Sequence, residues 1–491
     1  MAQAVDKQAY MTDSSGDRYF VVHVPSSTNE AIENARRHIV FTDDFHQQID
    51  EDDFYLHAQN SARVIDSTRA LAKLFVLPVD VLDRGRGNLK FLFVMGHEIT
   101  DGLTTYTWLN HFLNLLNVPM RSLETEIRSL IKASVIRKRL PSAQEDLYPP
   151  IFGQAARRSW YWAITRVLRH VRKPLPAAFP NPLRRALPLT QAISLPSTYP
   201  DLLNYAKVPI LNTYTVEARV PKLATQQLHR LCREAGASVG AGCFVLVAMV
   251  MMLLHEQNYS SEVDSARPPF IGGFPLNPRP LFNHAEPPDS LMLAFSDGVV
   301  LPFLSSSLDT ATRFKVLVRQ AHRQLGKYKK RQKEGDAEKI AYMGNHGAGR
   351  VLAIMYTSVI DWPRLKLLGG VSGSQAAITS PQGLYPVNEN LSQSTNNISS
   401  LGRSAWKRGQ YDINMWLEDK GEDAFVADFR AFKQNVRARE GEFHVAVCGE
   451  DDGTVAANVS YDGNSIDADS ARKWKFHMET ILDGLVQSPR L

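Results

Sequence analysis

The chain has 491 residues, 44% of them hydrophobic, and 56 Lys and Arg against 51 Asp and Glu give a net charge of +5. This length predicts two or three domains, and the weak positive charge excludes a typical nucleic-acid-binding protein. The three cysteines, Cys232, Cys243 and Cys448, form no CxxC pair, and the polar N-terminus carries no secretory signal. We therefore expect no disulfide framework, no metal site and a cytoplasmic location.

The N-terminal third predicts a strand over Tyr19–Val24 and an amphipathic helix from Ser27 to about Ile49. A second strand is predicted over Leu89–Met95, where apolar and aromatic residues are interrupted only by Lys90. From Leu103, apolar residues recur at helical spacing. A strand therefore leads into a helix, and the turn between them is short.

This turn contains Gly96, His97, Asp101 and Gly102. A histidine held at the end of a strand by rigid elements on both sides is well placed to act as a general base. The alternative is an ordinary polar residue at a helix start. We favour the base.

Eight prolines lie between Lys173 and Pro209. Because proline removes a backbone donor and restricts the preceding residue, this stretch predicts an extended crossover between two lobes. The expected organisation is an N-terminal lobe over residues 1–172, the crossover over 173–209 and a C-terminal lobe over 210–491.

In the C-terminal lobe, Val239–Leu254 has sixteen residues without a charge and follows Ser238, a good N-cap. It is short for a membrane span, so a buried helix is predicted. Gly369–Ser400 is rich in Gly, Ser, Asn and Gln and is interpreted as a long loop. The chain ends with an alternating hairpin around the turn at Asp451–Gly453, followed by a helix.

The residues His97–Gly102 have the form HxxxDG, which resembles the active-site motif of the CoA-dependent acyltransferase superfamily. That superfamily includes chloramphenicol acetyltransferase and peptide-synthetase condensation domains. The place of a second histidine before the motif is taken by Gly96, and no DFGWG motif follows. The chain is therefore most similar to the fungal trichothecene 15-O-acetyltransferase-like enzymes. The resemblance implies an α/β fold of two lobes, each a mixed sheet flanked by helices, with an active-site tunnel between them.

The same resemblance implies a catalytic role for His97 and structural roles for Asp101 and Gly102. It makes Arg279, at the end of Asn277-Pro278-Arg279, the candidate partner of Asp101. The alternatives are an Asp101 that orients His97 and an exposed Arg279. Further candidates are residues for the oxyanion or substrate, namely Ser399, Ser400 and Asn277, and residues for the CoA phosphates, namely Lys327, Lys329, Lys330 and Arg331. A serine in such a loop and a charge run at a helix end are more often simply solvated.

The function implied is transfer of an acyl group, expected to be acetyl, from acyl-CoA to a hydroxyl of a small secondary metabolite such as a terpenoid or polyketide. Acyl-CoA would be a co-substrate, with no bound cofactor, no metal, no nucleic acid and no membrane span, and we expect a monomer. Two alternatives stay open. The donor could be an acyl carrier protein, as in condensation-like offloading enzymes, or the chain could be a non-catalytic binding member of the fold.

Overall fold

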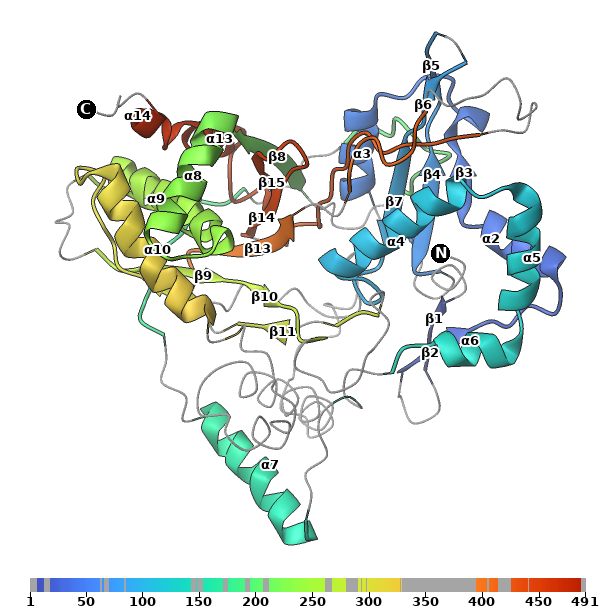
Figure 1. Ribbon diagram of the computed structural model, residues 1–491, viewed down its shortest axis with the longest axis horizontal. Coiled ribbons are helices and arrows are strands. Elements are labelled where there is room, and N and C mark those ends of the chain that lie inside the picture. Colours follow the sequence, from blue (N-terminus) through green and yellow to red (C-terminus); the bar gives the residue numbers. More distant parts are fainter. Residues whose placement is uncertain are drawn as a thin grey trace.

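The computed structural model describes residues 7–12, 18–61, 64–65, 70–83, 85–142, 147, 153–170, 175–189, 195–205, 212–260, 267–279, 290–292, 294–296, 298–326, 328, 394–403, 406–413, 425–439 and 441–486. Figure 1 shows most of their helices and strands in two groups that lie side by side. One group comes from the N-terminal third of the chain and the other from the remainder. Each contains a mixed sheet with helices packed on it, so the predicted α/β fold class is confirmed.

The N-terminal group is built around a three-stranded sheet of order β3-β4-β7, in which β3 runs parallel and β7 antiparallel to β4. Its elements are β1 (Lys7–Thr12), β2 (Arg18–Val22), α2 (Thr28–Arg36), β3 (Ile39–Phe41), a 3₁₀ turn (Thr42–Asp44), α3 (Glu51–Asn60), β4 (Ala72–Val76), β5 (Asp80–Val81), β6 (Gly87–Asn88), β7 (Phe91–Met95), α4 (Gly102–Leu116), α5 (Met120–Leu130) and α6 (Ala133–Arg139). Helix α7 (Ala155–His170) follows in the sequence but lies apart from both groups (Figure 1). The helix predicted from Ser27 to Ile49 is wrong beyond Arg36, because β3 begins at Ile39.

Side-chain alternation along β7 places the two main helices of this group on opposite faces of the sheet. Phe91 and Phe93 form edge-to-face contacts with Phe112 of α4. Their neighbours Leu92 and Val94 pack instead into the cluster around Phe54 of α3. The helix that follows the HxxxDG turn is therefore fixed directly against the strand that precedes it.

The C-terminal group is built around a six-stranded mixed sheet of order β12-β9-β13-β14-β15-β8. Its elements are β8 (Thr213–Val220), α8 (Lys222–Glu234), α9 (Val239–Asn258), β9 (Phe270–Gly273), β10 (Pro275–Leu276), β11 (Ala294–Phe295), β12 (Val299–Leu301), α10 (Thr310–Gly326), β13 (Asn396–Arg403), β14 (Phe443–Gly449), β15 (Val455–Asp462), α13 (Ala468–Thr480) and α14 (Asp483–Val486). The predicted hairpin is present as β14 and β15. The loop predicted up to Ser400 is wrong at its end, because β13 begins at Asn396 and pairs in parallel with β14.

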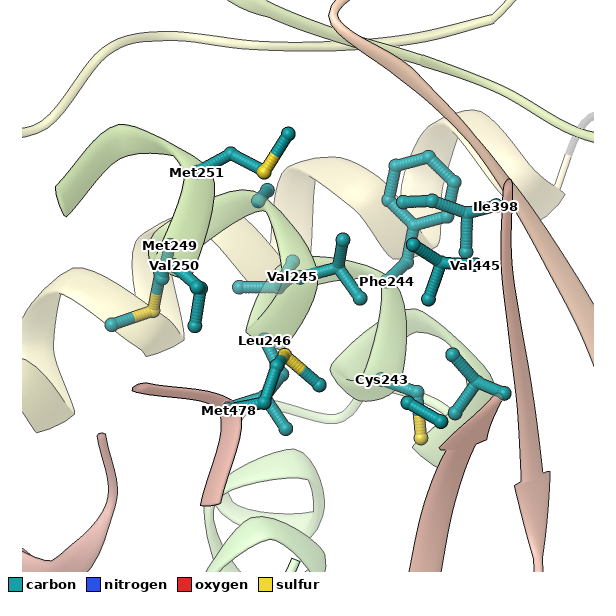
Figure 2. Packing of buried hydrophobic residues seen from close by; sticks show 14 of the residues in the cluster. Cys243, Phe244, Val245, Leu246, Met249, Val250, Met251, Ile398, Val445 and Met478 are labelled. Carbon is teal, nitrogen blue, oxygen red and sulfur yellow. The ribbon is translucent and has the colours of Figure 1, made fainter. Parts of the chain in front are cut away.

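The core of the C-terminal group surrounds α9, which is apolar on every side and begins at the predicted N-cap Ser238. Figure 2 shows Phe244 of this helix beside Ile398 of β13 and Val445 of β14, and Leu246 beside Met478 of α13. Among the described residues, α9 is the one helix long and apolar enough to cross a membrane. Because strands and helices cover it on all sides, it is the buried helix that the sequence predicted.

The crossover contributes to both cores. Phe179 is fully buried in the core of the C-terminal group, where it lies beside His255 of α9. Tyr199 and Leu203 are buried in the N-terminal cluster around Phe54. The proposed boundaries at 172 and 209 stay a prediction, but the described crossover residues are anchored to each side.

A second segment, residues 425–439, joins the groups from the other direction. It comes from the last quarter of the chain, yet Ala427 forms a pair of backbone hydrogen bonds with the side-chain amide of Asn117, after α4. Arg437 donates to the backbone oxygens of Ala58 and Ser61. Figure 1 shows this segment, in orange, running across the N-terminal group.

Candidate active site

The turn between β7 and α4 presents His97 at the surface and holds its ring by one nitrogen. Nδ1 lies 2.7 Å from the backbone oxygen of Thr100. Because a carbonyl oxygen only accepts, Nδ1 must carry the proton, and in the neutral ring Nε2 has a free lone pair. The side chain is exposed and not packed into a core. The geometry thus leaves a basic nitrogen available to a bound molecule.

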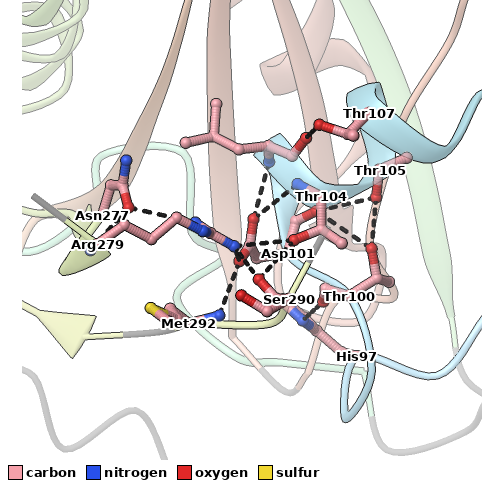
Figure 3. A network of polar contacts seen from close by, with 11 residues as sticks. His97, Thr100, Asp101, Thr104, Thr105, Thr107, Asn277, Arg279, Ser290 and Met292 are labelled. Atoms are coloured by element: carbon pink, nitrogen blue, oxygen red, sulfur yellow. Dashed lines mark hydrogen bonds and ion pairs between the residues drawn. The ribbon is translucent and has the colours of Figure 1, made fainter. Parts of the chain in front are cut away.

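Two buried threonines fix the carbonyl that holds this ring (Figure 3). The hydroxyls of Thr100 and Thr105 are 2.9 Å apart. The Thr105 hydroxyl also lies 2.9 Å from the backbone oxygen of Asp101, to which it donates. A hydroxyl can donate once and accept twice, so these bonds form a connected chain from α4 back to the turn. The position of the His97 ring therefore depends on side chains in the first turn of α4.

The carboxylate of Asp101 points away from His97 in its hydrogen bonding. Oδ1 caps α4 by accepting from the backbone N–H groups of Leu103 and Thr104, at 2.9 and 3.0 Å. Oδ2 accepts from Arg279 Nη2 at 2.6 Å and from the backbone N–H of Met292 at 3.1 Å. With both oxygens occupied by these donors, the arrangement is architectural and not that of a triad.

Burial alone would raise the pKa of Asp101, since it disfavours the charged form. The backbone N–H of Thr104, the Arg279 guanidinium and the backbone N–H of Met292 together outweigh that effect, and they lower the pKa of the carboxyl. The side chains of Arg279 and Asp101 are 16% and 9% exposed. The pair is therefore a mostly buried ion pair between the N-terminal and C-terminal groups.

Arg279 is itself held by several acceptors. Its Nη2 donates to the Thr104 hydroxyl at 3.0 Å and to the backbone oxygen of Ser290. Asn277 Oδ1 accepts from the backbone N–H and from Nη1 of Arg279, at 3.1 and 3.2 Å. Asn277 thus positions the arginine, and its proposed contact with substrate stays a prediction.

At Gly102, the last residue of the motif, a side chain of the C-terminal sheet packs directly against the turn. A Cβ at this position would lie 2.6 Å from Cδ2 of Leu401. Leu401 lies at an irregularity of β13 between Ser400 and Gly402, and Gly402 has a φ of +79°. Leu401 faces the N-terminal group, where it packs beside Tyr106 of α4. A larger residue at position 102 would therefore have to displace the end of the Leu401 side chain.

The other candidate residues divide by their place on β13. Ile398 points into the core beside α9, so its neighbour Ser399 points to the opposite face of the sheet. Ser400 lies on the α9 side, where its Oγ would be 3.7 Å from a Cβ at Gly240.

The candidates for the CoA phosphates, Lys327, Lys329, Lys330 and Arg331, lie outside the described residues. No group of three His, Cys, Asp or Glu side chains that could hold a metal ion occurs within the described ranges.

Several residues of this site had no sequence signal. Thr100 and Thr105 act through hydroxyl and carbonyl groups that any sequence offers in large number. Met292 and Ser290 contribute only backbone atoms. Leu401 directly follows the candidates Ser399 and Ser400 in the sequence, but nothing in the sequence predicts its contact with Gly102.

No protein-family model and no curated protein sequence matches this chain. In structure, the chain is similar to the trichothecene 15-O-acetyltransferase from Fusarium sporotrichioides, with a TM-score of 0.56 and 10% identity over 98% of this chain and 83% of that one. It also matches the epimerization domain of the third module of tyrocidine synthetase B, with a TM-score of 0.47 and 11% identity over 99% and 85% of the two chains. The condensation domain of the Monacolin K polyketide synthase matches with a TM-score of 0.47 and 12% identity, over 100% of this chain and 87% of that one.

The first of these similarities shows the fold, which this chain shares with the trichothecene 15-O-acetyltransferase over 98% of its length. The resemblance predicted from HxxxDG is therefore confirmed at the level of the fold. At 10% identity the similarity does not carry over an activity, a donor or an acceptor. The predicted tunnel between the lobes stays a prediction.

Proposed function

We propose that this protein is an O-acyltransferase that moves an acyl group, expected to be acetyl, from acyl-CoA to a hydroxyl of a small secondary metabolite, with His97 as the general base. The observation that carries the proposal is the bond from His97 Nδ1 to the Thr100 oxygen. It fixes the tautomer in which Nε2 can accept a proton. It also requires no second charged residue beside the ring.

The reaction needs one proton to move twice. Nε2 takes the proton from the acceptor hydroxyl as its oxygen attacks the thioester carbonyl carbon. The tetrahedral intermediate then collapses, the carbon–sulfur bond breaks, and the imidazolium returns the proton to the CoA thiolate. The products are an ester and free CoA. Ser399, on the face of the sheet away from α9, is the proposed donor to the oxyanion, in preference to Ser400.

The proposal is tested by incubating the purified chain with acetyl-CoA and a panel of hydroxylated terpenoids and polyketides, and detecting esters by mass spectrometry. His97→Ala should fold with an unchanged melting temperature and lose about 10²- to 10⁴-fold in rate. His229→Ala, a matched histidine change on α8 of the C-terminal group, should retain the rate. Turnover retained by His97→Ala would exclude the base. If product forms only when the acyl group is attached to a carrier protein, the donor is the acyl carrier protein and not acyl-CoA.

A further inference from the structure

Helix α7 (Ala155–His170) presents a stripe of large apolar side chains to solvent. Trp160, Ile164 and Val167 are 68%, 51% and 58% exposed. Their spacing of four and three residues places them on one side of the helix. The adjacent side faces the protein, because Thr165 is buried and Tyr161 is half-buried. Figure 1 shows α7 at the lower end of the molecule, apart from the other labelled elements.

Charge is strongly segregated along the sequence, in the segment that contains α7. Residues 147–200 contain eight Lys and Arg and no Asp or Glu. The remainder of the chain has 48 Lys and Arg against 51 acidic residues, so the net positive charge of the whole protein comes from this one segment. Four of the arginines are in α7 itself. Arg184 and Arg185 of the segment lie instead against the C-terminal group, at Gly441 and Ser465. A helix with four arginines, no acidic residue and exposed apolar side chains suits an occupant that is both anionic and apolar.

From this combination we propose that α7 is a docking helix for an anionic lipid bilayer, with Trp160, Ile164 and Val167 inserted at the level of the headgroups. Amphipathic helices that lie in the membrane interface have basic residues on one side and Trp or aliphatic residues on the other. The stripe stands on the convex surface of a single helix at the lower end of the molecule (Figure 1). A bilayer can accept such a convex shape, whereas a folded acidic protein would need a complementary cavity.

The inference does not depend on His97 or on the acyl donor. It concerns a surface formed by α7, whereas the proposed reaction takes place at the turn between β7 and α4. A membrane-docked enzyme would meet apolar acceptors at the bilayer, where they concentrate. Loss of docking would leave turnover of a water-soluble acceptor unchanged, so the two proposals can fail separately.

The experiment is co-sedimentation of the purified full chain with phosphatidylcholine vesicles, with and without phosphatidylserine, at low and raised salt. Binding should require phosphatidylserine and weaken as salt rises. Each of Trp160→Ser, Ile164→Ser and Val167→Ser should reduce binding about tenfold, the equivalent of one large apolar side chain leaving the bilayer. Phe476→Ser is the matched control, since Phe476 is 60% exposed on α13 of the C-terminal group.

Melting temperatures should be the same for all four variants, because each replaces an exposed side chain. Binding of all three α7 variants at the level of wild type would overturn the proposal, as would equal binding to vesicles without phosphatidylserine. A third overturning result is binding of a soluble acidic carrier protein through α7 with no binding to vesicles. That outcome would make the helix a protein-docking surface.

Discussion

The two lobes differ in how they complete their cores. The C-terminal lobe has one large core around α9, built almost entirely from its own strands and helices. The N-terminal lobe has several smaller clusters, and two of them need later segments of the chain. The cluster around Phe54 includes Tyr199 and Leu203 of the crossover, and the cluster around Tyr106 includes Trp406 and Phe432.

This difference bears on the proposed chemistry, because the candidate base lies on the lobe that depends on the other. The HxxxDG turn is held from the C-terminal side by Arg279, Met292 and Leu401. The C-terminal lobe thus holds the turn in place, and the N-terminal lobe carries the candidate base. Changes at the contacts between the lobes should affect both stability and rate, whereas changes inside the C-terminal core should affect stability alone.

The largest effect is expected at the ion pair between the lobes. Asp101→Asn or Arg279→Gln should each destabilise the protein by about 3 to 5 kcal/mol, because each leaves a mostly buried charge without its partner. The double variant should cost less than the sum of the two. Thermal melts of the three variants measure this. Two unshifted melts, or two shifts that simply add, would contradict the coupling.

The next effect compares the two cores directly. Leu246→Ala in α9 and Leu203→Ala in the crossover should each cost roughly 2 to 5 kcal/mol, since both side chains are buried. Hydrogen exchange followed by mass spectrometry can separate the lobes. Leu246→Ala should raise exchange in both lobes, and Leu203→Ala only in the N-terminal lobe. If Leu203→Ala raised hydrogen exchange in α9 as much as in the N-terminal lobe, the C-terminal core would not be independent of the N-terminal one.

A smaller effect is expected where the lobes touch at Gly102. Gly102→Ala should cost roughly 1 to 3 kcal/mol and lower turnover, because its Cβ would overlap the Leu401 side chain. The far end of a leucine can move, so the backbone need not shift. Leu401→Ala in the same chain should therefore restore part of the turnover. Gly484→Ala is a control with an open environment, since nothing lies within 4 Å of its Cβ position. If the double variant Gly102→Ala and Leu401→Ala recovered no turnover, overlap with Leu401 would not be the cause of the loss in Gly102→Ala.

The elements and contacts that the sequence predicted well are those with strong local signals. The helix after HxxxDG and the buried α9 follow from periodicity and capping residues. The contact between Asp101 and Arg279 was reached only through a motif resemblance, because the two residues are 178 positions apart and neither has a signal of its own. The helix predicted from Ser27 failed at Ile39–Phe41, where a three-residue strand is too short to show a period of two.

The remaining features could not have been predicted because they arise from tertiary structure. The tautomer of His97 is set by the backbone oxygen of Thr100, whose direction depends on the turn. Residues 425–439 pack on the N-terminal lobe through hydrogen bonds with Asn117, Ala58 and Ser61 and through the contact of Phe432 with Tyr106. Such contacts leave no pattern in one sequence, since amides, carbonyls and threonines occur everywhere.

The smallest expected effect is the pH dependence of the contact between the lobes. The pKa of Asp101 is lower in the folded protein than its ordinary value of 3.8. The folded state therefore binds fewer protons there than the unfolded state, and the carboxylate contributes stability that is fully present above pH 3.8. That contribution is lost as the pH falls through the lowered pKa. The melting temperature of Asp101→Asn should lie well below that of wild type at neutral pH, and the gap should narrow as the pH falls below 3.8.

Glu442, inside the C-terminal lobe, provides the comparison for this titration. Burial alone would raise the pKa of Glu442, but the hydrogen bonds with His444 and Arg439 outweigh burial and lower this pKa to about 2. The gap between the melting temperatures of wild type and Glu442→Gln should narrow in the same way, from near pH 4.5, the ordinary pKa value, down to about pH 2. Turnover distinguishes the two sites, because only Asp101 caps the helix next to His97. At neutral pH, Asp101→Asn should lower the rate together with the melting temperature, and Glu442→Gln should lower the melting temperature alone. Equal losses of rate in both variants would mean that the contacts of Asp101 are no more important for the position of the His97 ring than those of Glu442.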